Sequence, residues 1–306
     1  MGKSGWRWAQ RVIGAAVLFF IVRDFLKNWD KVKAQPIAWH FRWEYIIASL
    51  LITWVMYVVL IWGWRLVLHG WGQWIRAIDA ARIWSISSLG KYIPGKVWAI
   101  AGMAMMAEKQ GVSGAAATGS AIVMQLLSIA TGAVIALALT GTTLLEAVPG
   151  GSIASIAVAA VALIGAVSLA SPSVTRRIGF LVRRPDAVQP VDPNALAGAL
   201  FANLIAWGGY GLSFQLLAAG TIPSVVISWS TATGAFAASY IVGYLTLFLP
   251  GGFGVREGIM YALLRGSIGD GPAIALAAAS RITLTVNELG IAFPFVMRWV
   301  GRPRDS

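Results

Sequence analysis

The chain has 306 residues, of which 58% are hydrophobic and only 12% charged, and its formal net charge is +12. A soluble domain carries about 25% charged residues, so this composition excludes an ordinary soluble protein and indicates an all-α polytopic membrane protein. The absence of cysteine excludes disulfides and thiolate metal sites, and two histidines are too few for a histidine-rich metal centre, so we expect no cofactor.

Apolar runs of bilayer-spanning length recur along the chain, and because they are continuous rather than alternating, helices are the expected spanning elements. The expected spans are 8–25, 43–66, 116–140, 152–171, 195–219 and 271–298, the first being the weakest. Basic residues flank many of these runs, which favours contact with a membrane surface over contact with nucleic acid. We predict a single integral membrane domain over 1–306.

Two further apolar stretches, 81–111 and 230–265, are each interrupted near the middle by proline and glycine. The interrupting residues are Pro94 and Gly95 in the first stretch, and Pro250, Gly251, Gly252 and Gly254 in the second. Proline lacks an amide donor and frees backbone groups, which at membrane depth must face protein or a wet cavity. Each stretch is therefore predicted to form a broken, re-entrant hairpin. The whole chain then has about six to eight transmembrane helices.

The two stretches are candidates for copies of one unit. A shift of 156 residues aligns Pro94 with Pro250, Gly95 with Gly251, Gly102 with Gly258 and Gln125 with Arg281. The match is not continuous, and glycine and proline coincidences are common in membrane helices, so coincidence stays an alternative. The units would cover 43–140 and 195–298. Three predicted spans separate their starts, and this odd number predicts an inverted repeat of the kind found in transporters.

The basic connections predict the orientation. With the N terminus inside, 65–109, 172–194 and the C-terminal tail face the cytoplasm, while 141–151, which has no Lys or Arg, faces out. The exception is 23–42, whose five basic residues would lie outside.

The first tip reads Gly-Lys-Tyr-Ile-Pro-Gly-Lys over 90–96 and matches the phosphate-loop pattern. Val97 stands where that pattern needs Ser or Thr, and no strand precedes it, so we exclude a nucleotide site. A helix N-terminus still offers free amides to an anion, with Lys91 and Lys96 beside it. The alternative is that both lysines extend to the lipid headgroups.

The second tip has three glycines within five residues and leads into a half-helix that begins with Arg256 and Glu257. Ionisable residues at membrane depth are costly and usually functional, although an internal Arg–Glu pair that holds the fold is the alternative.

Arg281, Thr285 and Glu288 share one face of the last span, and Arg281 and Glu288 are about 10 Å apart along its axis. Each therefore needs a partner on another element. The candidate partners are Arg256 or Lys96 for Glu288 and Glu257 for Arg281, and the alternative role is again structural. Gln125 holds the position in the first unit that matches Arg281.

The candidate substrate-binding residues are Lys91, Lys96, Gln125, Arg256, Glu257, Arg281 and Glu288. The sequence contains no Ser-His-Asp set and no metal cluster, so we expect no enzyme activity. Asn203, Ser213 and Gln215 are interpreted as helix-packing groups.

The chain resembles the lysylphosphatidylglycerol synthase transmembrane-region family of flippase-like membrane proteins. The resemblance rests on the motifs LGKYIPGKVW at 89–98 and LPGGFGVREG at 249–258, and on Arg281 in the following span. Their order and spacing match the family over roughly 45–298. The resemblance implies a membrane protein that moves lipids, or lipid-linked polar headgroups, between leaflets. Aminoacyl-phospholipid members carry a separate C-terminal synthase domain, which we expect to be absent because the chain ends at Ser306.

One departure from the family pattern lies in the first half. Where the family often has an acidic–basic pair, this sequence has Met124 and Gln125. The resemblance therefore leaves the headgroup preference, and any ion coupling through that pair, unassigned.

We predict a lipid flippase or transporter of the cytoplasmic membrane, with Arg256, Arg281 and the two lysines holding a phosphate-bearing headgroup in a cleft between the hairpins. The expected partners are membrane lipids, either an anionic phospholipid or a lipid-linked phosphate, and no nucleic acid. The alternative is a non-transporting membrane scaffold for a lipid-synthesis enzyme or a glycosyltransferase. A small-solute transporter ranks third.

Overall fold

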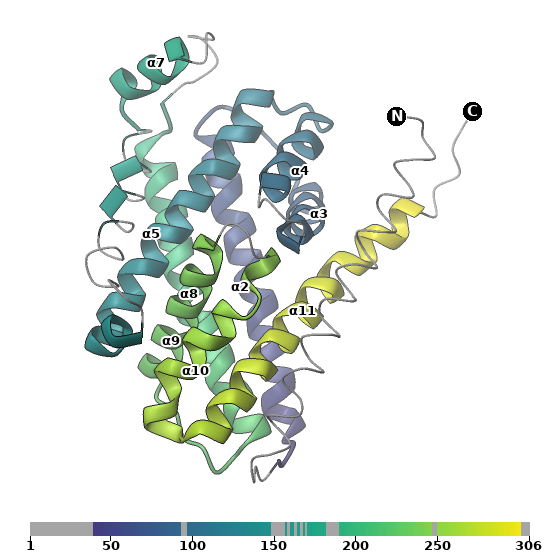
Figure 1. The fold of residues 1–306 in the computed structure, drawn as a ribbon. Coiled ribbons are helices and arrows are strands. Elements are labelled where there is room, and N and C mark those ends of the chain that lie inside the picture. Colours follow the sequence, from purple (N-terminus) through teal and green to yellow (C-terminus); the bar gives the residue numbers. More distant parts are fainter. Residues whose placement is uncertain are drawn as a thin grey trace.

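The computed structural model describes residues 39–92, 97–147, 170–181, 190–246 and 250–300, with a few positions between 157 and 168. Their secondary structure is entirely helical (Figure 1). The long helices are α2 (Trp43–His69), α5 (Gly114–Ala147), α8 (Pro193–Thr221) and α11 (Asp270–Val300). The shorter ones are α3 (Ala77–Ser88), α4 (Val97–Glu108), α7 (Pro172–Leu181), α9 (Trp229–Leu245) and α10 (Val255–Ile268), with 3-10 turns η1 (Leu89–Tyr92) and η2 (Pro250–Gly252).

Four helices in the described part of the chain are long and apolar enough to cross a membrane. They are Trp43–His69, Gly114–Gly141, Pro193–Thr221 and Asp270–Met297. These confirm four of the predicted spans to within a few residues. The predicted spans 8–25 and, apart from isolated positions, 152–171 lie outside the described residues, so the total of six to eight stays a prediction.

The long helices α2 and α8 run antiparallel and define the two ends of the bundle. At one end the backbone N–H of Arg42 donates to the carbonyl of Gly220 at 2.9 Å. At the other end the backbone N–H of Ser113 donates to Gln73 Oε1 at 2.9 Å. We call these the Gly220 end and the Gln73 end.

Each of the two interrupted stretches folds into a hairpin of short helices. The first, α3–η1–α4, starts and finishes at the Gln73 end, because Gln73 and Ser113 flank it and are hydrogen-bonded to each other. The second, α9–η2–α10, lies in the opposite half of the bundle, and the turns η1 and η2 contact each other (Figure 1). The 12-residue helices α3 and α4 are about 18 Å long and fall short of a bilayer core of about 30 Å.

The order of helix, broken hairpin, helix occurs twice along the chain. The contacts are paired in the same way: α5 packs on α9 of the second hairpin, while α11 packs on α3 of the first. Such an exchange is what two copies related by a twofold axis would make. The inverted repeat stays a prediction that this packing favours.

Two hydrophobic clusters form the core, one on each hairpin. Trp64, Leu68, Ile83 and Val123 lie in the cluster that joins α2, α3, α4 and α5. Phe214, Met260, Leu264 and Leu276 lie in the cluster that joins α8, α9, α10 and α11. Each hairpin packs on its own hydrophobic cluster. The polar side chains near η1 and η2 therefore lie between the two clusters.

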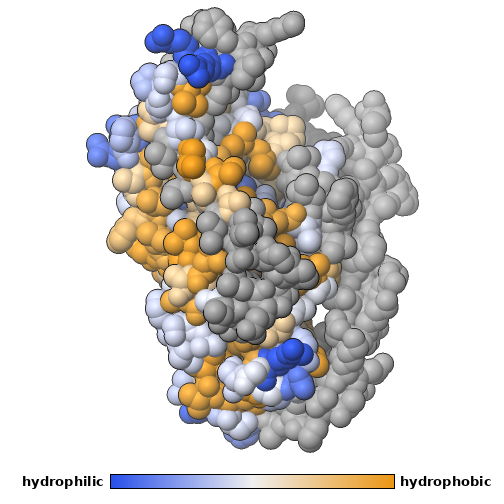
Figure 2. Space-filling view, turned by 60° about the vertical axis from the view of Figure 1, so that its left-hand side comes forward, coloured by the Kyte–Doolittle hydropathy of each residue, from blue (hydrophilic) through white to orange (hydrophobic). Residues whose placement is uncertain are grey.

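The outer surface is apolar over its middle. Figure 2 shows hydrophobic side chains spread over the middle of one face, below a hydrophilic top and above a lower part where hydrophobic and hydrophilic side chains are mixed. Val58, Phe201 and Phe293 are among the large side chains that remain exposed. A band of this kind suits hydrocarbon, and it marks the chain as a multi-pass membrane protein.

Of the three polar residues of α8 interpreted as helix-packing groups, Ser213 joins α8 to another helix, whereas Gln215 bonds the loop before α9 and Asn203 bonds its own helix and lines a cavity. The Ser213 hydroxyl lies 2.9 Å from Ser49 Oγ and 2.8 Å from Thr53 Oγ1 on α2. Gln215 donates to the Ile227 carbonyl at 2.9 Å, and Asn203 donates to the Ala199 carbonyl at the same distance. The connection 172–194, which the sequence analysis treated only as a basic loop, contains the helix α7. This helix begins at Pro172, and proline is a favoured first helical residue.

Candidate functional site

The site begins with the glycine turn between α9 and α10. Gly251, Gly252 and Gly254 have φ values of 58°, 71° and 78°, which side chains other than glycine rarely adopt. A β-carbon on Gly252 would lie 2.6 Å from the Gly243 carbonyl oxygen of α9. Glycine at 252 thus lets η2 lie directly on α9, and the turn directs the Gly251 carbonyl toward α11.

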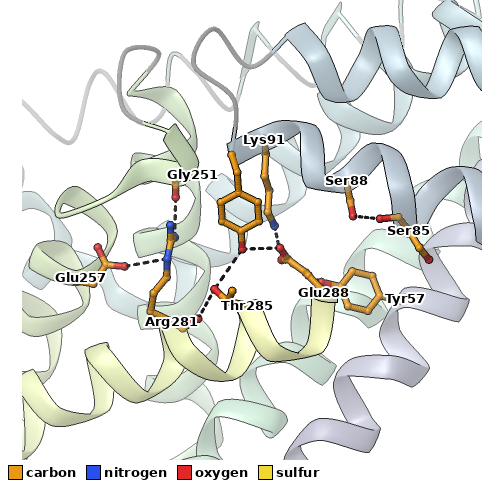
Figure 3. Close-up of polar contacts among 10 residues, drawn as sticks. Tyr57, Ser85, Ser88, Lys91, Gly251, Glu257, Arg281, Thr285 and Glu288 are labelled. Atoms are coloured by element: carbon orange, nitrogen blue, oxygen red, sulfur yellow. Dashed lines mark hydrogen bonds and ion pairs between the residues drawn. The ribbon is translucent and has the colours of Figure 1, made fainter. Parts of the chain in front are cut away.

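Arg281 of α11 donates a hydrogen bond to that carbonyl. Its Nη1 donates to Gly251 O at 2.8 Å, and its Nε lies 3.8 Å from Glu257 Oε1 (Figure 3). The other Glu257 oxygen accepts the backbone N–H of Gly254 at 2.7 Å, which caps the start of α10. The expected pairing of Glu257 with Arg281 is confirmed, and Glu257 has an additional role as a helix cap.

Glu288, one turn beyond Thr285 on α11, is the most heavily bonded group of the site. Its side chain is 2% exposed and forms an ion pair with Lys91 of η1. Tyr92 Oη donates to Glu288 Oε2 at 2.8 Å, and Tyr57 Oη donates to Glu288 Oε1 at 3.2 Å.

The partner of Glu288 differs from the one the sequence suggested. Sequence analysis proposed Arg256 or Lys96, whereas the ion-pair partner among the described residues is Lys91. The reason is geometric: the Lys91 and Tyr92 side chains of η1 reach α11, while the Arg256 guanidinium turns toward the aromatic rings of α9. Lys96, together with Pro94 and Gly95, lies outside the described residues.

Arg256 is a buried cation with no carboxylate partner. It is 5% exposed, and within the described part of the chain no acidic group forms an ion pair with it. Its guanidinium carbon lies 5.0 Å from the Phe236 ring centre and 5.1 Å from that of Tyr240, and its Nη2 has no hydrogen-bond partner. Cation–π contacts recover part of the desolvation cost but satisfy no N–H donor.

Arg281 is similarly under-satisfied. Its Nε and Nη2 are buried and have no hydrogen-bond partner, although Phe253 lies 4.0 Å below the guanidinium carbon. Two arginines therefore present unused donors in one small region of the protein.

Two adjoining cavities contain these groups. The smaller, of about 30 Å³, is lined by Lys91, Tyr92, Tyr240, Tyr244, Gly251, Arg256, Arg281, Leu284 and Glu288. The larger, of about 160 Å³, lies beside it and is lined mainly by aromatic, small and neutral polar side chains, Gln125 among them. Lys91, Tyr240 and Glu288 line both and form a shared wall.

The predicted site residues are thus largely brought together. Lys91, Arg256, Arg281 and Glu288 line the smaller cavity, Gln125 lines the larger one, and Glu257 lies next to Arg281. Whether these residues bind a substrate stays a prediction.

Sequence reasoning missed the tyrosines. Tyr57 and Tyr92 bind Glu288, and Tyr210 and Tyr240 line the larger cavity. A tyrosine in an apolar helix resembles an interfacial anchor, so nothing in a single sequence marks these four as a set. The only local signal is Tyr92, which directly follows Lys91 in the first tip.

The comparisons with known proteins agree with this architecture. The family model for the lysylphosphatidylglycerol synthase TM region matches residues 7–287, which is nearly the whole chain. A search of curated proteins found no match. A match of this extent, on a multi-pass helical fold, connects the protein with lipid metabolism or transport at a membrane. The chain belongs to the lysylphosphatidylglycerol synthase TM-region family.

Proposed function

We propose that this protein is a lipid flippase or transporter, which moves a phospholipid or a polyprenyl-linked lipid headgroup across the cytoplasmic membrane. The observation that carries the proposal is Arg256, a buried cation whose Nη2 donor is unsatisfied and which has no carboxylate partner in the described chain. A buried charge without a partner lowers the folding stability of a protein by several kcal/mol. Proteins tolerate this loss of stability where the charge binds a ligand.

The ligand that fits is an anion with oxygen acceptors. Arg256 and Arg281 line the same small cavity, and both have free guanidinium donors there. Guanidinium groups bind phosphate through paired hydrogen bonds, which a single neutral acceptor cannot replace. In a membrane protein with an apolar exterior, the phosphate of a lipid headgroup is the anion that reaches this depth.

The two hairpins provide a path for the headgroup. We infer that both are re-entrant, that they belong to an inverted repeat and that their touching tips close the site in the observed state. Opening one tip at a time would expose the arginines to one leaflet and then the other, while the acyl chains stay in hydrocarbon. Glu257 and Glu288 balance the positive charge through their ion pairs with Arg281 and Lys91.

The test is lipid movement by the purified protein in liposomes. Fluorescent phospholipid and polyprenyl-phosphate lipids are reconstituted with the wild type, Arg256→Gln, Arg281→Gln and the double variant. We expect the double variant to lose at least tenfold in rate, because both phosphate donors are removed. Arg265→Gln is the matched control, because Arg265 lies on the same helix α10 but is exposed.

Two outcomes would count against the proposal. If the double variant moves lipid as fast as wild type, the arginines are not the binding site. If wild-type protein moves no lipid and instead purifies with a stoichiometric enzyme partner, the scaffold alternative is correct.

A further inference from the structure

The larger cavity has a different chemistry from the arginine pocket beside it. Its walls include the aromatic rings of Tyr57, Trp84, Trp207, Tyr210, Phe236, Tyr240 and Tyr244. Gln125 and Tyr210, an amide and a phenol, also line this cavity. Aromatic faces joined with amide and phenol groups suit a ligand that is apolar on its C–H faces and rich in hydroxyls at its edges.

Charge separates the two cavities further. Of the described residues that line the larger cavity, only Lys91 and Glu288 are charged, and they are paired with each other. These residues therefore offer no free carboxylate to a cationic group, and Arg256, which lines only the smaller cavity beside them, would repel one.

The predicted repeat relates residues of the two cavities to each other. Under the shift of 156 residues, Trp84 corresponds to Tyr240, Ile100 to Arg256 and Gln125 to Arg281. Trp84, Ile100 and Gln125 line the larger cavity, and Arg256 and Arg281 line the smaller one. At these positions the predicted repeat has neutral groups in the first unit and arginines in the second. The larger cavity itself is lined by residues of both units, such as Tyr57 from the first and Phe236 from the second.

The sizes match two parts of one headgroup. A water-sized group needs about 10–15 Å³ by this kind of measure, so the smaller cavity of about 30 Å³ takes two or three such groups. Two is the number of unesterified oxygens in a phosphodiester. On the same basis the larger cavity, of about 160 Å³, takes roughly 11 to 16 water-sized groups, which is the scale of a polyol or a sugar ring.

We propose that the larger cavity binds an uncharged, hydroxyl-rich headgroup, such as glycerol, inositol or a sugar, joined to the phosphate held by Arg256 and Arg281. This inference rests on the proposed function and names its substrate class. Gln125 donates to and accepts from headgroup hydroxyls, and Trp84 packs against the ring. Headgroups that carry an amine, such as ethanolamine or an aminoacyl group, are disfavoured.

The experiment compares lipid binding by the purified full chain in detergent, measured by native mass spectrometry or tryptophan fluorescence. The probes are phosphatidylinositol, phosphatidic acid, phosphatidylethanolamine and a neutral glycosyl diacylglycerol. We expect wild type to bind phosphatidylinositol about tenfold more tightly than phosphatidic acid, which corresponds to one or two net hydrogen bonds. Phosphatidylethanolamine should bind more weakly than either.

Variants assign the effect to one cavity or the other. Gln125→Leu should reduce phosphatidylinositol binding toward that of phosphatidic acid and leave phosphatidic acid binding unchanged, whereas Arg256→Gln should weaken both. Gln110→Leu is the matched control, because it makes the same substitution at an exposed position between α4 and α5. Unaltered thermal melting of Gln125→Leu would show that the fold is intact.

The failures are distinguishable. The inference on the headgroup is overturned if wild type binds phosphatidic acid or phosphatidylethanolamine as tightly as phosphatidylinositol, or if Gln125→Leu changes all lipids equally. Binding of phosphate lipids that does not respond to Arg256→Gln overturns the proposed function as well. Tight binding of the neutral glycolipid alone would retain the hydroxyl subsite and reject the phosphate site.

Discussion

At the scale of single residues, the site consists of buried charges that are compensated to different degrees. Glu288 has an ion pair with Lys91 and two phenol donors, whereas Arg256 contacts two aromatic rings and forms no ion pair with any described carboxylate. Fully paired buried charges stabilise the fold. Unpaired buried charges destabilise it, and a ligand of opposite charge removes that destabilisation when it binds. The two classes therefore predict opposite effects of mutation on stability.

Glu288→Gln is expected to destabilise the protein by about 3 kcal/mol, because it leaves the buried Lys91 ammonium without a counter-charge. Denaturant or thermal unfolding in detergent measures the change. The double variant Lys91→Met, Glu288→Gln should recover most of the loss, since no charge is then left unpaired. Glu108→Gln, at an exposed position on α4, is the control and should change nothing. Additive losses in the double variant would show that the pair does not couple.

Arg256→Met is expected to raise the melting temperature of lipid-free protein by a few degrees, because it replaces an uncompensated charge with an apolar side chain of similar length. The same variant should lose the stabilisation that wild type gains on adding anionic lipid. Arg265→Met should alter neither quantity. A lower melting temperature for Arg256→Met would mean that Arg256 serves the fold rather than a ligand.

At the scale of elements, the glycine turn between α9 and α10 combines two constraints that can be separated by mutation. Gly252 needs both a positive φ and the absence of a β-carbon against Gly243, while Gly254 has a positive φ but open space around it. Gly258, inside α10, has open space and an ordinary helical conformation.

Substitution by alanine should therefore destabilise the protein most at 252, by about 1–2 kcal/mol at 254 and not at all at 258, where helix propensity favours alanine. Thermal unfolding of the three variants gives the ranking. Equal losses at 252 and 254 would show that the contact with Gly243 contributes nothing.

The helices and hairpins also show which features of the structure could be predicted from the sequence. Four long helices were predictable from length and hydropathy, because a backbone in lipid must satisfy its own hydrogen bonds. The turn at 250–254 was predictable from its proline and glycines. The Lys91–Glu288 pair was not, since its members are 197 residues apart and the choice among several cations depends on how η1 lies against α11. The tyrosines carried no pattern at all.

At the scale of the whole molecule, the predicted orientation assigns opposite sides of the membrane to the two ends of the bundle. Gln110 lies close to Ser113 at the Gln73 end, and Val226, which is 90% exposed, follows α8 at the Gly220 end. The positive-inside rule puts the first in the cytoplasm and the second outside.

Because the chain has no cysteine, single-cysteine variants have no background. Gln110→Cys is expected to react with a membrane-impermeant maleimide only from the cytoplasmic side of oriented vesicles, and Val226→Cys only from the opposite side. Labelling of both from the same side would rule out the antiparallel span α8 as a crossing. Labelling from reversed sides would invert the predicted orientation only.

The link between Lys91 and Glu288 joins the tip of the first hairpin to the last long helix. Pulling these halves apart would strand an ammonium and a carboxylate in a poorly hydrated space, so an idle molecule should remain shut. Under the proposed function, an incoming phosphate headgroup would give the Lys91 ammonium a second anionic partner. The ion pair would then be easier to separate with a bound lipid than without one, so the empty protein would not open an ion pathway across the membrane.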